Sequence, residues 1–195
     1  MSQKLILASA SPQRKSLLNG LGFPFSVEVS GIDEGAHPEM DPVRRAQVLA
    51  KEKAQDVFKR FPGTFVIGCD TLVVAADGSL LEKADDAKGA RAMVRKLSGA
   101  VSVVHSALCV VAPGGQMHEG ISSSKVRFKR LTDAEIDWWI STDLWRGRSG
   151  SFQIDGPGQV MIDHLEGDWT GVVGLPVFLL GCLLQDAGYV LFGRS

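Results

Sequence analysis

The chain has 195 residues, 21 basic and 22 acidic side chains that give a net charge of −1, and 45% apolar residues. This length and composition predict one folded domain over residues 1–195 and exclude a disordered chain. The balanced charge counts against a dedicated nucleic-acid-binding protein, which usually presents a basic face. We therefore expect no nucleic-acid partner.

The cysteines and the apolar runs indicate in which cellular compartment the protein is expected. Cys69, Cys109 and Cys182 are odd in number and each lies in an apolar run, which indicates buried free thiols in a reducing compartment. No apolar stretch approaches the roughly 20 residues of a membrane span, and the N-terminus lacks the apolar core of a signal peptide. We expect a soluble, cytoplasmic protein without a membrane partner.

Strand and helix patterns alternate in the first half of the chain. Ser11-Pro12 supplies a helix cap followed by proline at the first helical position. The nearly continuous apolar run Thr64–Val74 is typical of a central strand that is buried on both faces. The elements predicted here are strands at 4–9, 23–29 and 64–74, and helices that begin at Pro12 and span 41–60.

The second half continues the alternation, which predicts a mixed α/β class. Thr132 and Glu135 form a capping box at the start of a short helix. The elements predicted here are a turn at 77–78, a helix at 86–97, strands at 101–112, 120–128 and 160–165, a glycine-rich loop at 146–158 and an apolar C-terminal helix that ends at Gly188. That last helix serves either a homodimer or the core.

The first candidate for chemistry lies between the first strand and the first helix. Ser9 and Ser11 supply hydroxyl groups at a helix N-terminus, where free N–H groups and the helix dipole favour anions. Arg14 adds a planar fork that suits phosphate oxygens. The alternative is an ordinary helix cap beside a surface arginine.

The second candidate is Asp70, a carboxylate within the apolar strand. A carboxylate in such a run loses its solvation unless it pairs with a cation or binds a metal. The alternatives are a catalytic group and a structural ion pair. Lys53, on the predicted helix at 41–60, lies about 60° from the centre of the apolar stripe, so it either points into a cleft or extends to solvent along the core.

Two further charged residues are weaker candidates by themselves. Lys83 follows an apolar pair at the end of a predicted hairpin arm, where a surface lysine is ordinary. Glu34 lies in an acidic loop, and a Mg²⁺ ion that bridges phosphates needs only one or two carboxylates.

Six segments in this order resemble the Maf-like nucleoside triphosphate pyrophosphatases: LILASASPQRKSLL, LAKEKA, VIGCDTLVV, LEKADD, ARAMVRKLSG and VVGLPVFLL. The resemblance implies an elongated mixed, partly antiparallel sheet flanked by helices, with two lobes and a central cleft, as in inosine triphosphatases. It implies hydrolysis of a nucleoside triphosphate to the monophosphate and pyrophosphate with Mg²⁺ or Mn²⁺, in a house-cleaning role.

The resemblance also assigns roles to residues of this chain. Asp70 matches the proposed proton acceptor, and we expect it to share a metal ion with Glu34. The residues that match the family's phosphate- and substrate-binding positions are Ser9, Ser11, Arg14, Glu34, Lys53 and Lys83.

Three positions bear on the substrate base, and they give a mixed pattern. Thr71 fits relatives that act on dTTP and UTP, which carry Thr there, whereas Gln13 and Asp155 do not. Asp155, after Gly150-Ser151-Phe152, is nearer to relatives that act on 7-methyl-GTP, in which an acidic side chain accepts hydrogen bonds from guanine. The substrate therefore stays open between these two types.

Two other functions compete with the enzyme. A nucleotide-binding regulatory protein linked to cell division, with little turnover, is the first, because Gln13 and Ser102 depart from the family pattern. An RNA-binding role is the second, and the near-neutral charge counts against it.

Overall fold

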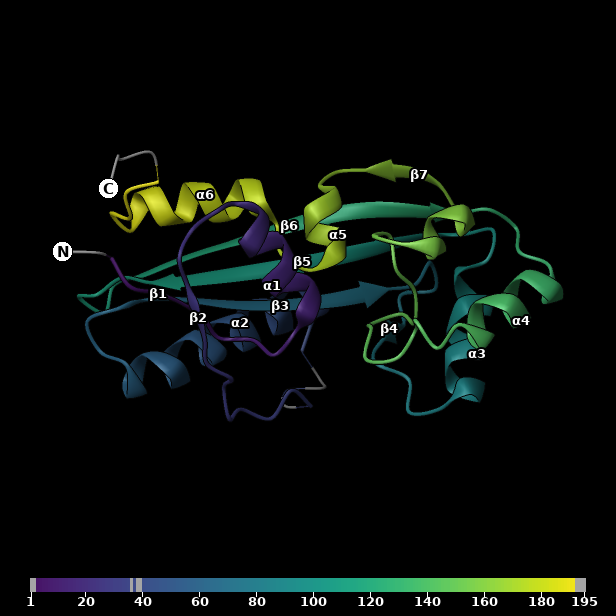
Figure 1. Cartoon of the computed structure of the whole chain (residues 1–195). Coiled ribbons are helices and arrows are strands. Elements are labelled where there is room, and N and C mark those ends of the chain that lie inside the picture. Colours follow the sequence, from purple (N-terminus) through teal and green to yellow (C-terminus); the bar gives the residue numbers. More distant parts are fainter. Residues whose placement is uncertain (1–2, 36, 38–39, 192–195) are drawn as a thin grey trace. The chain divides into compact units, whose positions relative to one another are not determined.

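The computed structural model describes residues 3–35, 37 and 40–191 and shows a mixed α/β protein (Figure 1). The chain divides into two compact units. Unit 1 consists of Met1–Asp70, Ser106–Ser122 and Gly174–Ser195, and unit 2 consists of Thr71–His105 and Ser123–Val173. Three strands contribute residues to both units, and they are β3 (Phe65–Val74), β5 (Val101–Val111) and β6 (Met117–Phe128).

The described strands form a seven-stranded sheet in the order β2–β1–β3–β5–β6–β7, with β4 paired to β3. Strand β1 (Leu5–Leu7) pairs in parallel with β2 (Ser26–Val27) and with β3. Strand β4 (Leu80–Leu81) and strand β7 (Ile162–Glu166) pair antiparallel to β3 and β6. The predicted mixed, partly antiparallel sheet is confirmed, whereas the cleft between two lobes stays a prediction.

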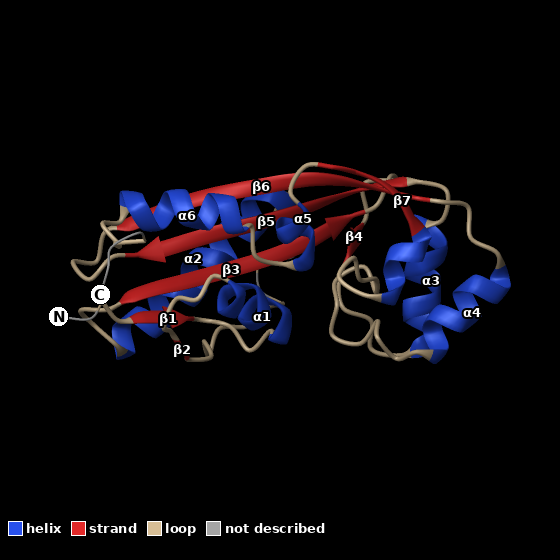
Figure 2. Cartoon of the chain, turned by 45° about the horizontal axis from the view of Figure 1, so that its top comes forward, coloured by secondary structure: helices blue, strands red, loops and turns tan. Residues whose placement is uncertain are grey.

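In unit 1, helices cover both faces of the strands, because successive side chains of a strand point to opposite faces. Helices α1 (Pro12–Gly20) and α6 (Val177–Asp186) lie on one face and α2 (Pro42–Arg60) lies on the other (Figures 1 and 2). The buried strand side chains toward α1 and α6 include Leu5, Leu7, Phe65 and Ile67, and those toward α2 include Ile6, Ala8 and Val66.

Gly68 of β3 lets α2 approach the strand closely. A Cβ atom at Gly68 would overlap the carbonyl oxygen of Ala50 and would lie 2.7 Å from the backbone nitrogen of Ala54. Gly68 and Asp70 are two residues apart in β3, so both face α2. The missing side chain at Gly68 therefore sets the distance between α2 and the strand that carries Asp70.

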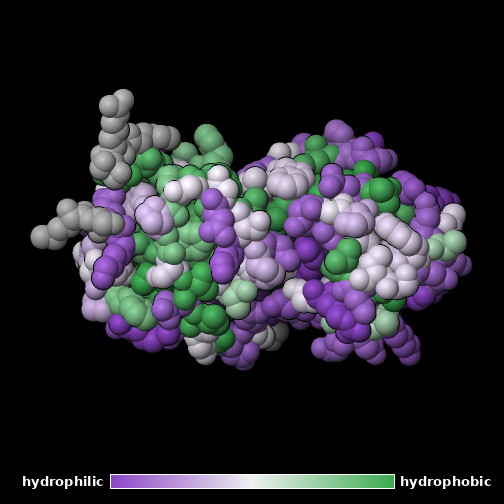
Figure 3. All heavy atoms as spheres, in the orientation of Figure 1, coloured by the Kyte–Doolittle hydropathy of each residue, from purple (hydrophilic) through white to green (hydrophobic). Residues whose placement is uncertain are grey.

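Unit 2 is built around two buried tryptophans. Trp139 of α4 (Asp133–Ser141) and Trp145 are fully buried, and the Phe128 and Phe152 rings meet edge to face with their centroids 5.0 Å apart. The other helices of the unit are α3 (Ala87–Leu97), the short 3₁₀ turn η1 (Pro157–Met161) and α5 (Trp169–Val173). The predicted capping box at the start of α4 is present. Hydrophilic side chains cover much of the surface over α3 and α4 (Figure 3).

Four elements differ from the sequence prediction. The strand predicted at 160–165 begins at Ile162, because the 3₁₀ turn η1 occupies the residues before it. Strand β2 is only two residues long, because it lies at the sheet edge and pairs with the short β1. Strand β6 begins at Met117 and continues through Gly120, where a Cβ atom would lie 2.8 Å from Cδ1 of Leu179. The missing side chain at Gly120 therefore lets α6 pack closely against β6, and the strand continues through the glycine. Helix α5 was not predicted.

The three cysteines are free thiols, with Cys69 and Cys109 buried and Cys182 half-buried. Burial raises the pKa of Cys109 to about 12, so this thiol stays neutral at physiological pH. Across the described residues, none of the helices is long and apolar enough to cross a membrane. The C-terminal helix packs three leucines, Leu180, Leu183 and Leu184, into unit 1, so it serves the core, and the homodimer stays a prediction.

We expect Gly68→Ala to lower the free energy of unfolding by about 3 kcal/mol, because the new methyl group must push α2 away from β3. Urea unfolding of the purified variant measures the change. Gly181→Ala in α6 is the matched control, because no atom lies within 4 Å of its Cβ position. That control should keep the stability of the starting protein or raise it by about 0.5–1 kcal/mol. Equal stability of the two variants would contradict the predicted packing.

Candidate functional site

The predicted site residues fall into two groups, one in each unit. Unit 1 holds Ser9, Ser11, Gln13, Arg14, Glu34, Lys53 and Asp70, and unit 2 holds Thr71, Lys83 and Asp155. Each group is described by itself, and the prediction that both serve one substrate stays a prediction.

The turn between β1 and α1 gathers hydroxyl and guanidinium groups. Ser11 is the N-cap of α1, and its Oγ accepts a hydrogen bond from the backbone nitrogen of Arg14 (3.4 Å). The buried Ser9 Oγ accepts hydrogen bonds from the Ser11 backbone nitrogen (3.2 Å) and from Nη1 of Arg14 (3.1 Å). Ser11 Oγ donates to Oε1 of Gln13 (3.0 Å). The turn thus presents donors at the positive end of a helix, which suits a phosphate group.

Arg14 is more constrained than a surface arginine. Its Nε donates to the carbonyl oxygen of Gly174 (2.9 Å), and the Cys69 thiol donates to the same carbonyl (3.0 Å). Two fixed acceptors, Ser9 Oγ and the Gly174 carbonyl, therefore orient the guanidinium. Gly174 was not among the predicted site residues, because a backbone acceptor leaves no side-chain pattern in the sequence.

Lys53 joins two carboxylates in unit 1. Its Nζ lies 2.7 Å from Oδ1 of Asp70 and 2.9 Å from Oε1 of Glu34. The lysine side chain is 3% exposed and that of Asp70 is 9% exposed, whereas that of Glu34 is 53% exposed. Lys53 therefore points into the protein, and the alternative that it extends to solvent is wrong.

The two carboxylate oxygens of Asp70 differ in their partners. Oδ2 is buried and has no hydrogen-bond partner among the described residues. A buried carboxylate oxygen without a donor costs free energy, which a cation or a water molecule at that point would recover. Among the described residues there is no group of three His, Cys, Asp or Glu side chains that could hold a metal ion. The donor set here is two carboxylates, Asp70 and Glu34, which fits an ion that keeps several water ligands.

The acidic loop is attached to α2 at several points. Nη2 of Arg45, a side chain that is 2% exposed, donates to the carbonyl oxygen of Glu34 (3.2 Å). The backbone nitrogen of Gly31 donates to Oδ2 of Asp56 (3.0 Å), and Nη2 of Arg60 donates to the carbonyl oxygen of Val29 (2.7 Å). The sequence analysis did not single out Arg45, which lies about 140° from the centre of the apolar stripe of α2.

In unit 2, Ser149 connects two of the predicted residues. Its Oγ donates to the carbonyl oxygen of Thr71 (3.2 Å), and its backbone forms an antiparallel bridge with Lys83. The backbone nitrogen of Gly150 donates to the carbonyl oxygens of Leu81 and Glu82, at 2.9 and 3.1 Å. The glycine-rich loop therefore lies against β3 at Thr71 and against the segment that follows β4 and carries Lys83.

The third predicted residue of unit 2, Asp155, is paired with an arginine of the same loop. Nη1 of Arg148 lies 3.1 Å from Oδ1 of Asp155, and the two side chains are 17% and 23% exposed. The sequence analysis treated Asp155 as a lone carboxylate. The pairing depends on the loop conformation, which residue spacing alone does not reveal.

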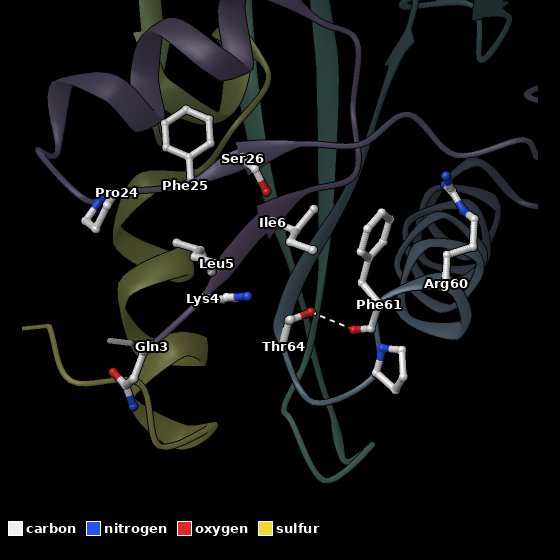
Figure 4. Close-up of a pocket in the computed structure, with 11 residues that line it drawn as sticks. Gln3, Lys4, Leu5, Ile6, Pro24, Phe25, Ser26, Arg60, Phe61 and Thr64 are labelled. Atoms are coloured by element: carbon white, nitrogen blue, oxygen red, sulfur yellow. Dashed lines mark hydrogen bonds between the residues drawn. The ribbon is translucent and has the colours of Figure 1, made fainter. Parts of the chain in front are cut away.

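A groove of about 680 Å³ lies elsewhere in unit 1. It is formed at the amino ends of β1 and β3 and at the carboxyl end of α2, where Ile6, Phe25 and Phe61 line it (Figure 4). It contains none of the predicted site residues.

Fold and site together define a mixed α/β protein in which serine, arginine and a lysine–carboxylate cluster gather beyond the carboxyl end of a parallel strand. The family model for Maf-like proteins matches residues 4–187. The chain belongs to the Maf-like protein family, as the sequence resemblance predicted.

Curated relatives match over nearly the whole chain. A dTTP/UTP pyrophosphatase of Pyrococcus furiosus is 38% identical over 183 residues, which are 94% of this chain and 95% of the relative. A dTTP/UTP pyrophosphatase of Deinococcus radiodurans is 40% identical over 191 residues, 97% of this chain and 96% of the relative. The solved structure of a HAM1 protein from Coxiella burnetii covers 94% of this chain and 99% of that chain at 10% identity and a TM-score of 0.49.

We expect Lys53→Met to lower the free energy of unfolding by about 3–5 kcal/mol, because it leaves the Asp70 carboxylate buried without its cation. Adding Asp70→Asn in the same chain should recover part of that loss, since the charge that lacks a partner is then gone. Urea unfolding of both single variants and the double variant measures the coupling. Additive losses would show that the two side chains do not stabilise each other.

Proposed function

We propose that this chain hydrolyses the α–β phosphoanhydride of dTTP or UTP, releasing pyrophosphate and a nucleoside monophosphate in a house-cleaning role. The enzyme class, a nucleoside triphosphate pyrophosphatase, is supported by membership of the Maf-like family and by the names of relatives that are about 40% identical. The observation that carries the proposal is the cluster in which the buried Lys53 joins the carboxylates of Asp70 and Glu34.

We assign phosphate binding to the turn after β1. The Arg14 fork and the hydroxyls of Ser9 and Ser11 lie at the N-terminus of α1, where they neutralise and orient phosphate oxygens. Phosphoryl transfer depends mainly on such positioning and charge neutralisation. Lys83 is proposed as a further cation for the substrate, on the match to the family motif.

Asp70 orients the attacking water and accepts its proton. Its Oδ1 is held by Lys53, so we assign the water to Oδ2, which is buried and has no hydrogen-bond partner among the described residues. The lysine also fixes the carboxylate in one rotamer, which is what a positioned general base requires. Glu34 is fixed at both ends, through its carbonyl by Arg45 and through its carboxylate by Lys53.

We also propose a divalent cation, Mg²⁺ or Mn²⁺, held by Asp70 and Glu34. The two carboxylates and the one ammonium of this cluster sum to a charge of −1, which favours a further cation. When bound, such an ion neutralises phosphate charge and makes a water ligand more acidic. The donor set of two carboxylates suits Mg²⁺, which completes its shell with water and substrate phosphates.

The substrate base is proposed from the relatives and from Thr71. Curated relatives named dTTP/UTP pyrophosphatases favour dTTP and UTP over 7-methyl-GTP. Gln13, Thr71 and Asp155 are proposed as the residues that set the preference. We further propose that the chain acts in the cytoplasm, which suits its three free thiols.

A panel of triphosphates tests the activity. With Mg²⁺ or Mn²⁺, dTTP and UTP should release pyrophosphate faster than 7-methyl-GTP and GTP, and excess chelator should abolish the release. Pyrophosphate is measured by a coupled assay. Tight calorimetric binding of UTP with no pyrophosphate from any triphosphate would favour the nucleotide-binding regulatory protein instead.

We expect Asp70→Asn to lower kcat by about 10²-fold or more, because an amide cannot accept the proton of the attacking water. Calorimetric affinity for UTP, measured without a divalent cation, should change much less, since the phosphate-binding turn is intact. Asp186→Asn, at the exposed end of α6, is the matched control and should keep the starting rate. An Asp70→Asn variant with full kcat would show that Asp70 is not the general base.

A further inference from the structure

The glycine-rich loop of unit 2 is built around one buried side chain. Gln153 is 7% exposed, and a Cβ atom at Gly156 would overlap its Nε2. A Cβ atom at Gly158 would overlap the carbonyl oxygen of the same residue. Both glycines are therefore required for the loop to close over Gln153, and this closure fixes Asp155, which lies between Gln153 and Gly156 in sequence.

The other side of the loop is fixed as well. The carbonyl oxygen of Ser151 accepts a hydrogen bond from Nε1 of the buried Trp139 (2.8 Å), and the Ser151 backbone nitrogen donates to the carbonyl oxygen of Arg148 (3.1 Å). The Arg148 backbone nitrogen in turn donates to the carbonyl oxygen of Trp145 (3.3 Å). Arg148 and Asp155 thus lie in two parts of one loop that are each held by contacts with the rest of unit 2 or with Gln153. The conformation of the loop therefore places the two side chains together.

The pairing changes what Asp155 offers to a ligand. An unpaired carboxylate presents two acceptors and a full negative charge, which match the adjacent N1–H and amino donors of guanine. Oδ1 of Asp155 is occupied by Arg148, so the pair presents Oδ2 as an acceptor beside guanidinium N–H donors and carries no net charge. An acceptor beside a donor is also what the side-chain amide of a glutamine presents.

We propose that Arg148, through its ion pair with Asp155, is a specificity-determining residue that makes this loop read uracil and thymine. These bases present N3–H between two carbonyl oxygens, so Oδ2 accepts from N3–H and the guanidinium donates to a neighbouring carbonyl. The inference deepens the proposed function and rests on it. It accounts for Asp155, which by its identity alone does not fit relatives that act on dTTP and UTP.

The test compares bases in single and double variants. Arg148→Met should lower the ratio of kcat/KM for UTP to kcat/KM for GTP by about tenfold or more, since it restores a two-acceptor carboxylate. Adding Asp155→Gln should return the ratio to within about threefold of the starting protein, because the amide supplies the acceptor and donor again. Arg146→Met is the matched control. Arg146 pairs with Asp143 at 3.0 Å on the exposed surface, so its loss should leave the ratio unchanged.

An equal loss of kcat/KM for every base, or no change in the ratio, would overturn the role of Arg148. Thermal melting shows whether each variant is folded, and Arg148→Ala replaces the methionine variant if that one does not fold. Calorimetric binding of UMP and GMP keeps this test separate from the proposed activity. The starting protein should prefer UMP and Arg148→Met should lose that preference, even if no triphosphate is hydrolysed. A starting protein that does not prefer UMP would overturn the inference.

Discussion

A buried ion pair between Lys53 of α2 and Asp70 of β3 is the interaction on which the site in unit 1 depends. Two charges are removed from water, and the cost is offset only because Nζ and Oδ1 are 2.7 Å apart. That distance requires α2 to lie unusually close to β3, which the missing side chain at Gly68 allows. The close packing of α2 on β3 at Gly68 and the ion pair between Lys53 and Asp70 therefore depend on each other.

The same helix organises the acidic loop. Arg45 holds the backbone of Glu34 and Lys53 holds its carboxylate, so two cations of α2 place one acidic side chain beside Asp70. A loop that was held only at its ends would lose this arrangement to conformational entropy. Because the loop also covers the side of α2 that bears Arg45, it removes that arginine from solvent.

Unit 2 uses a different device, a loop that closes around its own side chain. Gly156 and Gly158 are small because Gln153 occupies the space where their side chains would lie. The result is an Arg148–Asp155 ion pair. Under the role proposed for Arg148, the identity of Asp155 alone does not set the base that the loop favours.

Local patterns were enough for the sequence to determine most elements, the mixed fold class, the cap at Ser11 and the family. Those features depend on residue periodicity, capping chemistry and motif order, all of which can be read directly from the amino-acid sequence. Three features were decided by the tertiary structure alone, namely the burial of Arg45, the Gly174 carbonyl that orients Arg14, and the partner of Asp155. Each depends on segments that meet only after folding, and a helical wheel or a spacing rule takes no account of a loop that covers a helix or closes on itself.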